Sequence, residues 1–168
     1  MSAPLPMRPF MLADTPRLQD LYAQAIEELT QDEYDEDQRL AWMTRAADAE
    51  TFAERLGNNL TILVDQGNDI LGFASLKGNK EIDMLYVHPH AVGQGVGSAL
   101  IDALEKLAAA RGAQSLTVDA SDTAHEFFSR RGYGDVQRNT VPMGEVWLSN
   151  TTMSKPLVKT AAGAGRSH

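Results

Sequence analysis

The sequence predicts an α+β domain, in which helices flank a mixed, mainly antiparallel sheet that contains one parallel β-α-β crossover. Two strand patterns joined by a polar turn, with a third close behind, lie between residues 60 and 87. A single helical pattern then separates the third strand from the next, and this connection requires those two strands to run parallel. One crossover of this kind does not make a doubly wound fold.

The composition fits one domain with a single hydrophobic core. The chain has 168 residues, of which 43% are hydrophobic, so it can bury a core without disulfides or metals. It contains no cysteine, which excludes disulfides, thiolate metal sites and a cysteine nucleophile. Its net charge of -8 would repel a polyanion such as DNA, so no nucleic-acid partner is expected.

The sequence also predicts no membrane association. No apolar run approaches the roughly 20 residues that a membrane span needs, and Met1–Phe10 lacks a basic and then apolar signal pattern. We therefore expect a cytoplasmic protein.

The first part of the chain predicts one strand and three helices. The apolar run Met7–Leu12 predicts the strand, and Thr15-Pro16 supplies an N-cap with proline at the first helical position. Apolar residues at helical spacing then run from Leu18 to Leu29. A second helix is expected around Trp42 and Met43, and a third, containing Phe52 and Leu56, ends at Gly57-Asn58-Asn59.

The next elements are strands. Leu60–Asp65 and Ile70–Leu76 flank the polar turn Gln66–Asp69, which predicts a β-hairpin. After a second turn, Glu81–Val87 predicts the third strand.

The remaining elements complete the sheet. A helix is expected from Val96 to about Arg111, followed by a strand at Ser115–Asp119 and a short helix at Thr123–Arg131. Two more strands lie between Tyr133 and Met153. We expect residues 1–155 to form one domain and residues 156–168 a disordered tail, because the chain end is small and polar.

The loop before the second long helix carries the chemistry. Gly93, Gly95 and Gly97 occupy alternate positions just ahead of that helix. Glycine lets a backbone approach a ligand closely and turn its N–H groups inward, and the helix N-terminus adds free amide donors and a positive dipole end. The pattern predicts a pyrophosphate site that needs no basic side chain. A glycine-rich turn that merely starts the helix is the simpler alternative.

Two other phosphate loops fit less well. A Walker loop needs lysine before the serine, which Gly97-Ser98 lacks, and a dinucleotide fingerprint needs glycine where Ser98 stands. Asp119 does end the following strand, where a ribose-binding acid would lie. A Rossmann-like nucleotide-binding protein therefore stays an alternative, although the second mononucleotide half is missing.

Three motifs in order resemble the GNAT superfamily of acetyl-CoA-dependent N-acetyltransferases. Leu85–Pro89 matches the family strand ending Leu-x-Val-x-Pro, and Val92–Gly97 matches Arg/Gln-x-x-Gly-x-Gly/Ala. Ala124–Tyr133 is similar to the family's Ala-x-x-Phe-Tyr-x-x-x-Gly-Phe element. The resemblance covers about Met7–Lys155. Within it, Ile82–Leu85 and Asp119–Ser121, together with Phe127-Phe128, look like a bacterial subgroup related to YafP.

This resemblance implies a GNAT-like fold, acetyl-CoA as co-substrate, and no metal. The cofactor-binding residues that it implies are Leu85, Tyr86, Val87, Val92, Gly93, Gln94, Gly95, Val96, Gly97, Ser98, Phe127 and Phe128. Val92 stands where the family usually has Arg or Gln, and Phe128 replaces a frequent Tyr. These departures keep open a non-catalytic CoA-binding module as a second alternative.

The chain has no cysteine and no motif that pairs a serine with a base, so we expect direct transfer of acetyl to a primary amine in a ternary complex. The fold that the resemblance implies would place N–H groups near Tyr86 and Val87 where they hold the acetyl carbonyl. Strand alternation predicts that Glu81, Asp83, Leu85 and Val87 share one face, with Asp83 favoured over Glu81 as the base because it is nearer the acetyl group. A solvated edge or a salt bridge is the alternative role for these carboxylates. Ser121 and Tyr133 are the candidates for the acid, as is water.

The acceptor is expected to be a small-molecule or peptide amine. Tyr34 and Trp42, beside the acidic run Asp32–Asp37, would favour a cationic amine if they line its pocket, although such a run is commonly a solvated face. Asn150 is a further residue that could reach the acceptor. His88 and His90 do not make a metal site. The late strands offer edges that could pair in a homodimer.

Overall fold

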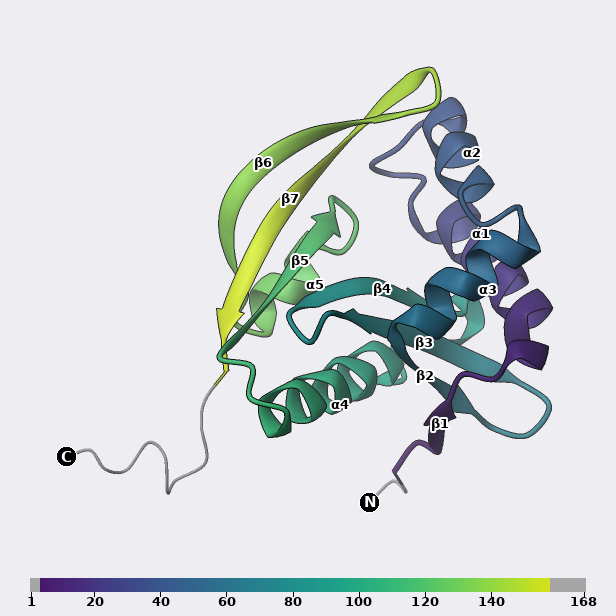
Figure 1. Ribbon diagram of the computed structural model, residues 1–168. Helices are drawn as coiled ribbons and strands as arrows, with labels where there is room; N and C mark the ends of the chain where they lie inside the picture. Colours follow the sequence, from purple (N-terminus) through teal and green to yellow (C-terminus); the bar gives the residue numbers. More distant parts are fainter. Residues whose placement is uncertain (1–3, 158–168) are drawn as a thin grey trace.

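The computed structural model describes residues 4–157. Their strands form one seven-stranded sheet in the order β1-β2-β3-β4-β5-β7-β6 (Figure 1). Neighbouring strands are antiparallel except β4 and β5, which are parallel. The predicted α+β class and the single crossover are therefore confirmed. In chain order the elements are β1 (Met7–Pro9), η1 (Leu12–Asp14), α1 (Thr15–Leu29), α2 (Glu36–Thr44), α3 (Ala49–Asn58), β2 (Leu60–Asp65), β3 (Ile70–Lys77), β4 (Glu81–Val87), η2 (Pro89–Ala91), α4 (Val96–Ala110), β5 (Ser115–Ser121), α5 (His125–Arg130), β6 (Gly134–Met143) and β7 (Val146–Pro156).

The first strand is shorter than the sequence predicts, because a buried carboxylate ends it. Asp14 accepts the backbone N–H of Met11 at 2.8 Å and pairs with Arg8 at 2.8 Å. These contacts fold Leu12–Asp14 into a 3-10 turn. The turn also makes Asp14, rather than Thr15, the residue that precedes α1.

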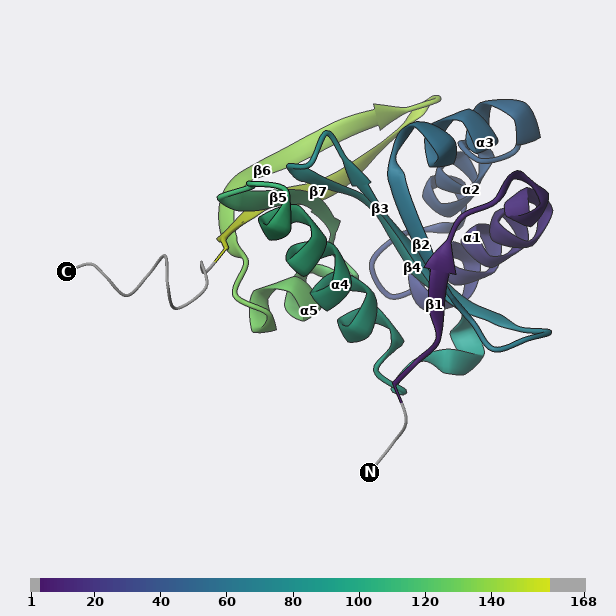
Figure 2. The ribbon, with the colours of Figure 1, turned by 60° about the horizontal axis from the view of Figure 1, so that its bottom comes forward.

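Two helical layers cover opposite faces of the sheet (Figure 1). On one face, Leu100, Ile101 and Leu104 of α4 and Phe128 of α5 are buried in one hydrophobic core. On the other face, residues of α1 and α3, among them Leu18 and Phe52, form a second core. Figure 2 shows α4 crossing the strands and β1 at the free edge.

The parallel pair β4–β5 is very short. Only Glu81–Thr117 and Ile82–Val118 are paired, and β5 continues along β7 while β4 continues along β3. The two strands therefore diverge after Ile82, as Figure 1 shows. This divergence opens the sheet at its centre.

A β-bulge in β4 makes the predicted alternation wrong. Ser75 pairs with Met84 and Leu76 with Ile82, so Asp83 has no partner on β3. Leu85 and Val87 pack on the α4 face, whereas Asp83 contacts α3 on the opposite face. Glu81 and Asp83 thus lie on the α1–α3 face. The extra residue of the bulge shifts the alternation, so that Leu85 and Val87 lie on the α4 face.

The last strand is longer than predicted. β7 continues to Pro156, and the N–H of Leu157 donates to the carbonyl of Gln114 at 2.8 Å. The start of the predicted 156–168 tail is therefore ordered, and residues 158–168 lie outside the described residues. Between residues 4 and 157, no helix is both long enough and apolar enough to cross a membrane.

Candidate active site

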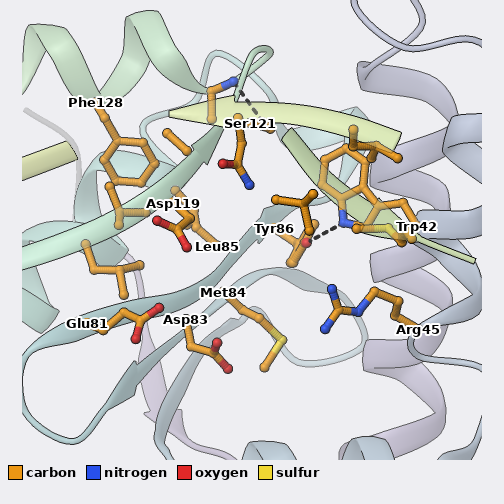
Figure 3. A pocket seen from close by; sticks show the side chains of 18 of the residues that line it. Trp42, Arg45, Glu81, Asp83, Met84, Leu85, Tyr86, Asp119, Ser121 and Phe128 are labelled. Carbon is orange, nitrogen blue, oxygen red and sulfur yellow. Dashed lines mark hydrogen bonds between the residues drawn. The ribbon is translucent and has the colours of Figure 1, made fainter. Parts of the chain in front are cut away.

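A cleft of about 270 Å³ lies where β4 and β5 diverge (Figure 3). The residues Glu81 to Tyr86 form one wall, and Val118 to Ser121 of β5 form the facing wall. Tyr34, Trp42 and Arg45 border it from the α2 side, and Ser149 and Asn150 of β7 close it. The predicted contribution of Asn150 to this region is therefore consistent with its position.

Glu81 and Asp119 bring carboxylates to the facing walls (Figure 3). Asp119 accepts a hydrogen bond from the Thr152 hydroxyl at 2.6 Å. Glu81 is half-buried, and no hydrogen bond or ion pair to its carboxylate is found among the described residues. Its carboxylate is therefore available to a ligand in the cleft.

Asp83 is held by α3. It accepts from Arg55 Nε at 2.8 Å and from Arg55 Nη2 at 3.1 Å, and from Asn59 Nδ2 at 2.9 Å. Burial acts to raise the pKa of Asp83, but the ion pair with Arg55 and the hydrogen bond from Asn59 outweigh it, so the pKa lies below its usual range. A carboxylate with a lowered pKa is a weak proton acceptor, which disfavours Asp83 as the base.

Asp83→Asn is expected to destabilise the fold by roughly 1–3 kcal/mol at neutral pH, because it leaves the half-buried Arg55 without its counter-charge. The folded-state pKa of Asp83 is depressed. Its contribution is therefore complete above the unfolded pKa of about 3.9 and is lost as the pH falls through the folded-state pKa. Urea unfolding of both proteins from pH 7 to pH 3 measures this difference. An equal stability of the two proteins at pH 7 would contradict the assignment.

The two hydroxyl candidates lie in different places. Ser121 lines the cleft, and its Oγ accepts the backbone N–H of Ala124 at 3.1 Å. Tyr133 is buried outside the cleft lining, where its hydroxyl donates to Glu105 Oε2 at 2.8 Å. Burial, together with this hydrogen bond, raises the pKa of Tyr133. The structure therefore does not place Tyr133 near the other candidate catalytic residues, because its hydroxyl contacts Glu105 of α4 instead.

The glycine loop has the backbone geometry that a phosphate site requires. Gly93 and Gly95 have φ values of +86° and +82°, and a Cβ at either position would meet no atom within 4 Å. Gly95 is the N-cap of α4, so the N–H groups of the next residues have no acceptor within the helix. Val92 is 55% exposed and Gln94 binds the His90 carbonyl at 3.1 Å, so backbone rather than side chains lines the loop. The residues present fit a diphosphate.

Gly97 lets α4 approach α5. A Cβ at Gly97 would lie 3.4 Å from the Phe127 ring, and Phe127 packs edge-on against Phe128 at 5.1 Å. Phe128 is buried and lines the cleft. This chain of contacts joins the glycine loop to the cleft on the α4 face, and Ser98 lies in the same first turn of the helix.

Tyr34 ties the α2 side of the cleft to the β5–β7 side. Its hydroxyl donates to the Ser149 carbonyl at 2.6 Å and accepts the Asp122 N–H at 2.9 Å, and burial raises its pKa to about 12. Its ring packs edge-on against Trp42 at 5.5 Å, and the indole N–H donates to the Tyr86 hydroxyl at 3.1 Å. Both aromatic residues line the cleft, as the sequence suggested.

The acidic run beside Tyr34 does not line the cleft. Within residues 32–37, Tyr34 alone contributes to the lining, and Asp35 instead caps α2 by accepting the Gln38 N–H at 2.9 Å. The argument for a cationic acceptor from this run is therefore wrong, because Asp35 caps α2, Glu33 accepts a hydrogen bond from the Thr123 hydroxyl at 2.6 Å, and none of these carboxylates lines the cleft.

Sequence reasoning missed three residues of the site. Arg55 and Asn59, four residues apart around the end of α3, reach β4 together, and this spacing was the one available signal. Arg45 follows α2, and nothing in the local sequence distinguishes it from a solvated arginine. Across residues 4–157, no group of three or more His, Asp or Glu side chains is placed to hold a metal ion.

Comparisons with known proteins point to one family. The family described as Acetyltransferase (GNAT) domain matches residues 30–157. The uncharacterized N-acetyltransferase YafP of Escherichia coli (strain K12) is 30% identical over 147 residues, which cover 88% of this chain and 93% of YafP.

Solved structures agree with this match. The crystal structure of a GCN5-related N-acetyltransferase from Rhodopseudomonas palustris is 51% identical, with a TM-score of 0.91 over 94% of this chain and 98% of that one. The PaiA N-acetyltransferase of Thermoplasma acidophilum, solved in complex with coenzyme A, is 16% identical and has a TM-score of 0.76 over 90% of this chain and 98% of that one. The second similarity supports the fold alone.

Proposed function

Because this chain belongs to the GNAT family of acetyltransferases, we propose that it transfers acetyl from acetyl-CoA to a primary amine by direct attack in a ternary complex. The observation that carries the proposal is the opening between β4 and β5, which joins a cleft with carboxylates to a glycine loop at the start of α4. Residues 1–155 would form the single catalytic domain.

The diphosphate of acetyl-CoA would bind the loop Val92, Gly93, Gln94, Gly95, Val96, Gly97 and Ser98 through backbone N–H groups and the positive end of α4. The pantetheine arm would then enter the gap between β4 and β5 and pair with the free edge of β4 after Ile82. Leu85, Tyr86 and Val87 would border it on β4, and Phe127 and Phe128 on α5. Backbone N–H groups near Tyr86 and Val87 would hold the acetyl carbonyl oxygen.

We propose Glu81 as the general base. An amine arrives protonated at neutral pH and attacks only after losing a proton. Glu81 would accept this proton, directly or through one water, because its carboxylate lines the cleft and has no partner among the described residues. Asp83 is the weaker candidate, since Arg55 and Asn59 already occupy its oxygens.

In the reaction, the amine nitrogen bonds to the thioester carbonyl carbon and the C–S bond breaks. The thiolate leaves with the electron pair of that bond, and as the amide forms the nitrogen gives a second proton to the same hydroxyl or water that protonates the thiolate. Ser121, which lines the cleft, or a water would protonate the thiolate. A thiolate leaves readily even unaided, since thiols have pKa values of about 8.5, so Phe128 in place of Tyr does not prevent turnover.

The proposal extends to the acceptor, the oligomeric state and the cellular location. The acceptor would be a small-molecule amine or a peptide amine. The outer edge of β6, an exposed strand at the end of the sheet, is where a second copy would add in a homodimer. The absence of cysteine favours the cytoplasm as the location.

Thermal unfolding with ligands tests the donor. Acetyl-CoA or CoA at about 100 times its Kd is expected to add about 2.7 kcal/mol to the free energy of unfolding, which raises the Tm by roughly 5–10 °C. NAD and ATP at the same concentration serve as controls and should leave the Tm almost unchanged. A shift with NAD or ATP and none with CoA would overturn the donor assignment. Release of free thiol in the presence of an amine panel then measures turnover.

A further inference from the structure

Arg45 brings an unpaired cation into the acceptor side of the cleft. It follows the last residue of α2 and lines the cleft together with Tyr34 and Trp42. Figure 3 shows its guanidinium directed into the cleft toward β4, on the side opposite Glu81. Among the residues that the structure describes, it has no side-chain hydrogen bond and no ion pair.

The other charges around the cleft make this cation distinctive. Arg55, the second cation of the lining, is already neutralised by Asp83 in a bidentate contact. Asp37 and Glu145 share a neighbouring groove with Arg45, but neither forms an ion pair with it within residues 4–157. Among the described residues that line the cleft, the charges without a counter-charge are thus two carboxylates, of Glu81 and Asp119, and one cation, the guanidinium of Arg45.

The position of Arg45 assigns it to the acceptor and not to acetyl-CoA. The glycine loop and α4 lie on one face of the sheet, with Phe128. Arg45 comes from the helices on the other face, where Trp42 packs beside the second core. The phosphates of the donor would be bound at the α4 side, so the Arg45 guanidinium faces the substrate that enters from the opposite side.

From this arrangement we propose that the acceptor is an amine that also carries a carboxylate, as in a small amino acid. The inference rests on the proposed function. The amine would lie toward Glu81 and Asp119 and the carboxylate on the planar fork of Arg45, which matches a carboxylate with two parallel N–H donors. The acceptor would enter the cleft from the α2 side, where Tyr34 and Trp42 line it beside Arg45. A diamine would instead place its second charge against Arg45.

The test is a panel of matched acceptor pairs. Each pair consists of a proteinogenic amino acid and the amine that has hydrogen in place of its carboxylate, such as methionine with 3-(methylthio)propylamine, or lysine with 1,5-diaminopentane. The kcat/KM of each is measured by thiol release at saturating acetyl-CoA. We expect the best amino acid to exceed its matched amine by roughly 10- to 100-fold, the range of a lost charge-assisted contact.

Arg45→Gln is expected to reduce this ratio to near one, chiefly through a higher KM for the amino acid. Arg111→Gln is the matched control, because it makes the same charge change on an exposed arginine that does not line the cleft. In that variant the ratio should stay at its wild-type value. Arg45→Lys should restore part of the preference, since lysine keeps the charge without the fork.

Two results would overturn the inference. One is a wild-type preference for the amines, and the other is a ratio that Arg45→Gln leaves unchanged. If no amino acid is acetylated while acetyl-CoA still raises the Tm, the acceptor class is wrong and the donor assignment stands. If acetyl-CoA does not raise the Tm at all, the proposed function itself fails.

Discussion

Glu81→Gln is expected to lower kcat/KM by roughly 10²- to 10⁴-fold at neutral pH, the usual range for the loss of a general base. Glutamine keeps the size of the side chain but cannot accept the proton of the attacking ammonium. Because Glu81 is half-buried in the cleft and does not support α3, the fold and the affinity for acetyl-CoA should change little. Initial rates of thiol release, together with the acetyl-CoA thermal shift, measure both quantities.

The control for this variant is Glu54→Gln, an identical change at an exposed glutamate of α3 outside the cleft lining. It should turn over at the wild-type rate. Raising the pH should partly rescue Glu81→Gln, since a larger fraction of the acceptor is then already neutral. Wild-type kcat/KM in Glu81→Gln would rule out this base, and a large loss in a folded Asp83→Asn protein would return the assignment to Asp83.

Gly95→Glu is expected to weaken acetyl-CoA binding by at least about 100-fold. Gly95 has a φ of +82° at the N-cap of α4, so a side chain there strains the backbone by about 1–2 kcal/mol. The added carboxylate would also sit beside the diphosphate, where one pair of like charges about 5 Å apart costs roughly 3 kcal/mol at an effective dielectric constant of about 20. Loss of the acetyl-CoA thermal shift measures the effect.

Gly67→Glu separates strain from binding. Gly67 has the same φ of +82° and equally open surroundings, but it lies in the β2–β3 turn and not in the glycine loop. The two variants should therefore lose similar stability, while only Gly95→Glu should lose the ligand response. Intact acetyl-CoA affinity in a folded Gly95→Glu protein would refute the assignment of the loop.

The sequence predicts those parts of the fold that depend on local pattern. The helix α4 follows from its apolar spacing, and the loop before it from glycines whose positive φ few other residues adopt. The parallel pairing of β4 and β5 follows from the length of the connection between them. The first two signals lie inside or next to the element that they specify, and the third is the length of one continuous connection.

The site was less predictable because its walls come from distant segments. A period of two cannot reveal the bulge at Asp83, which depends on how β4 pairs with β3. Tyr133 has a hydroxyl in the sequence, but only the packing of α5 on α4 shows that it binds Glu105. Arg45 belongs to the site only because residues of β4 and β7, which are far from it along the chain, line the same cleft.

The short contact between β4 and β5 also limits how firmly the two halves of the sheet are joined. Glu81–Thr117 and Ile82–Val118 are the backbone pairs that join one half-sheet to the other. Beyond these pairs, side-chain contacts connect the two sides of the opening, such as the hydrogen bond that the Tyr34 hydroxyl donates to the Ser149 carbonyl. A bound arm that bridges the opening would replace soft contacts by directional ones. We therefore expect the protein with acetyl-CoA bound to be more rigid around the cleft than the protein without it, so that the acceptor binds to the more rigid form.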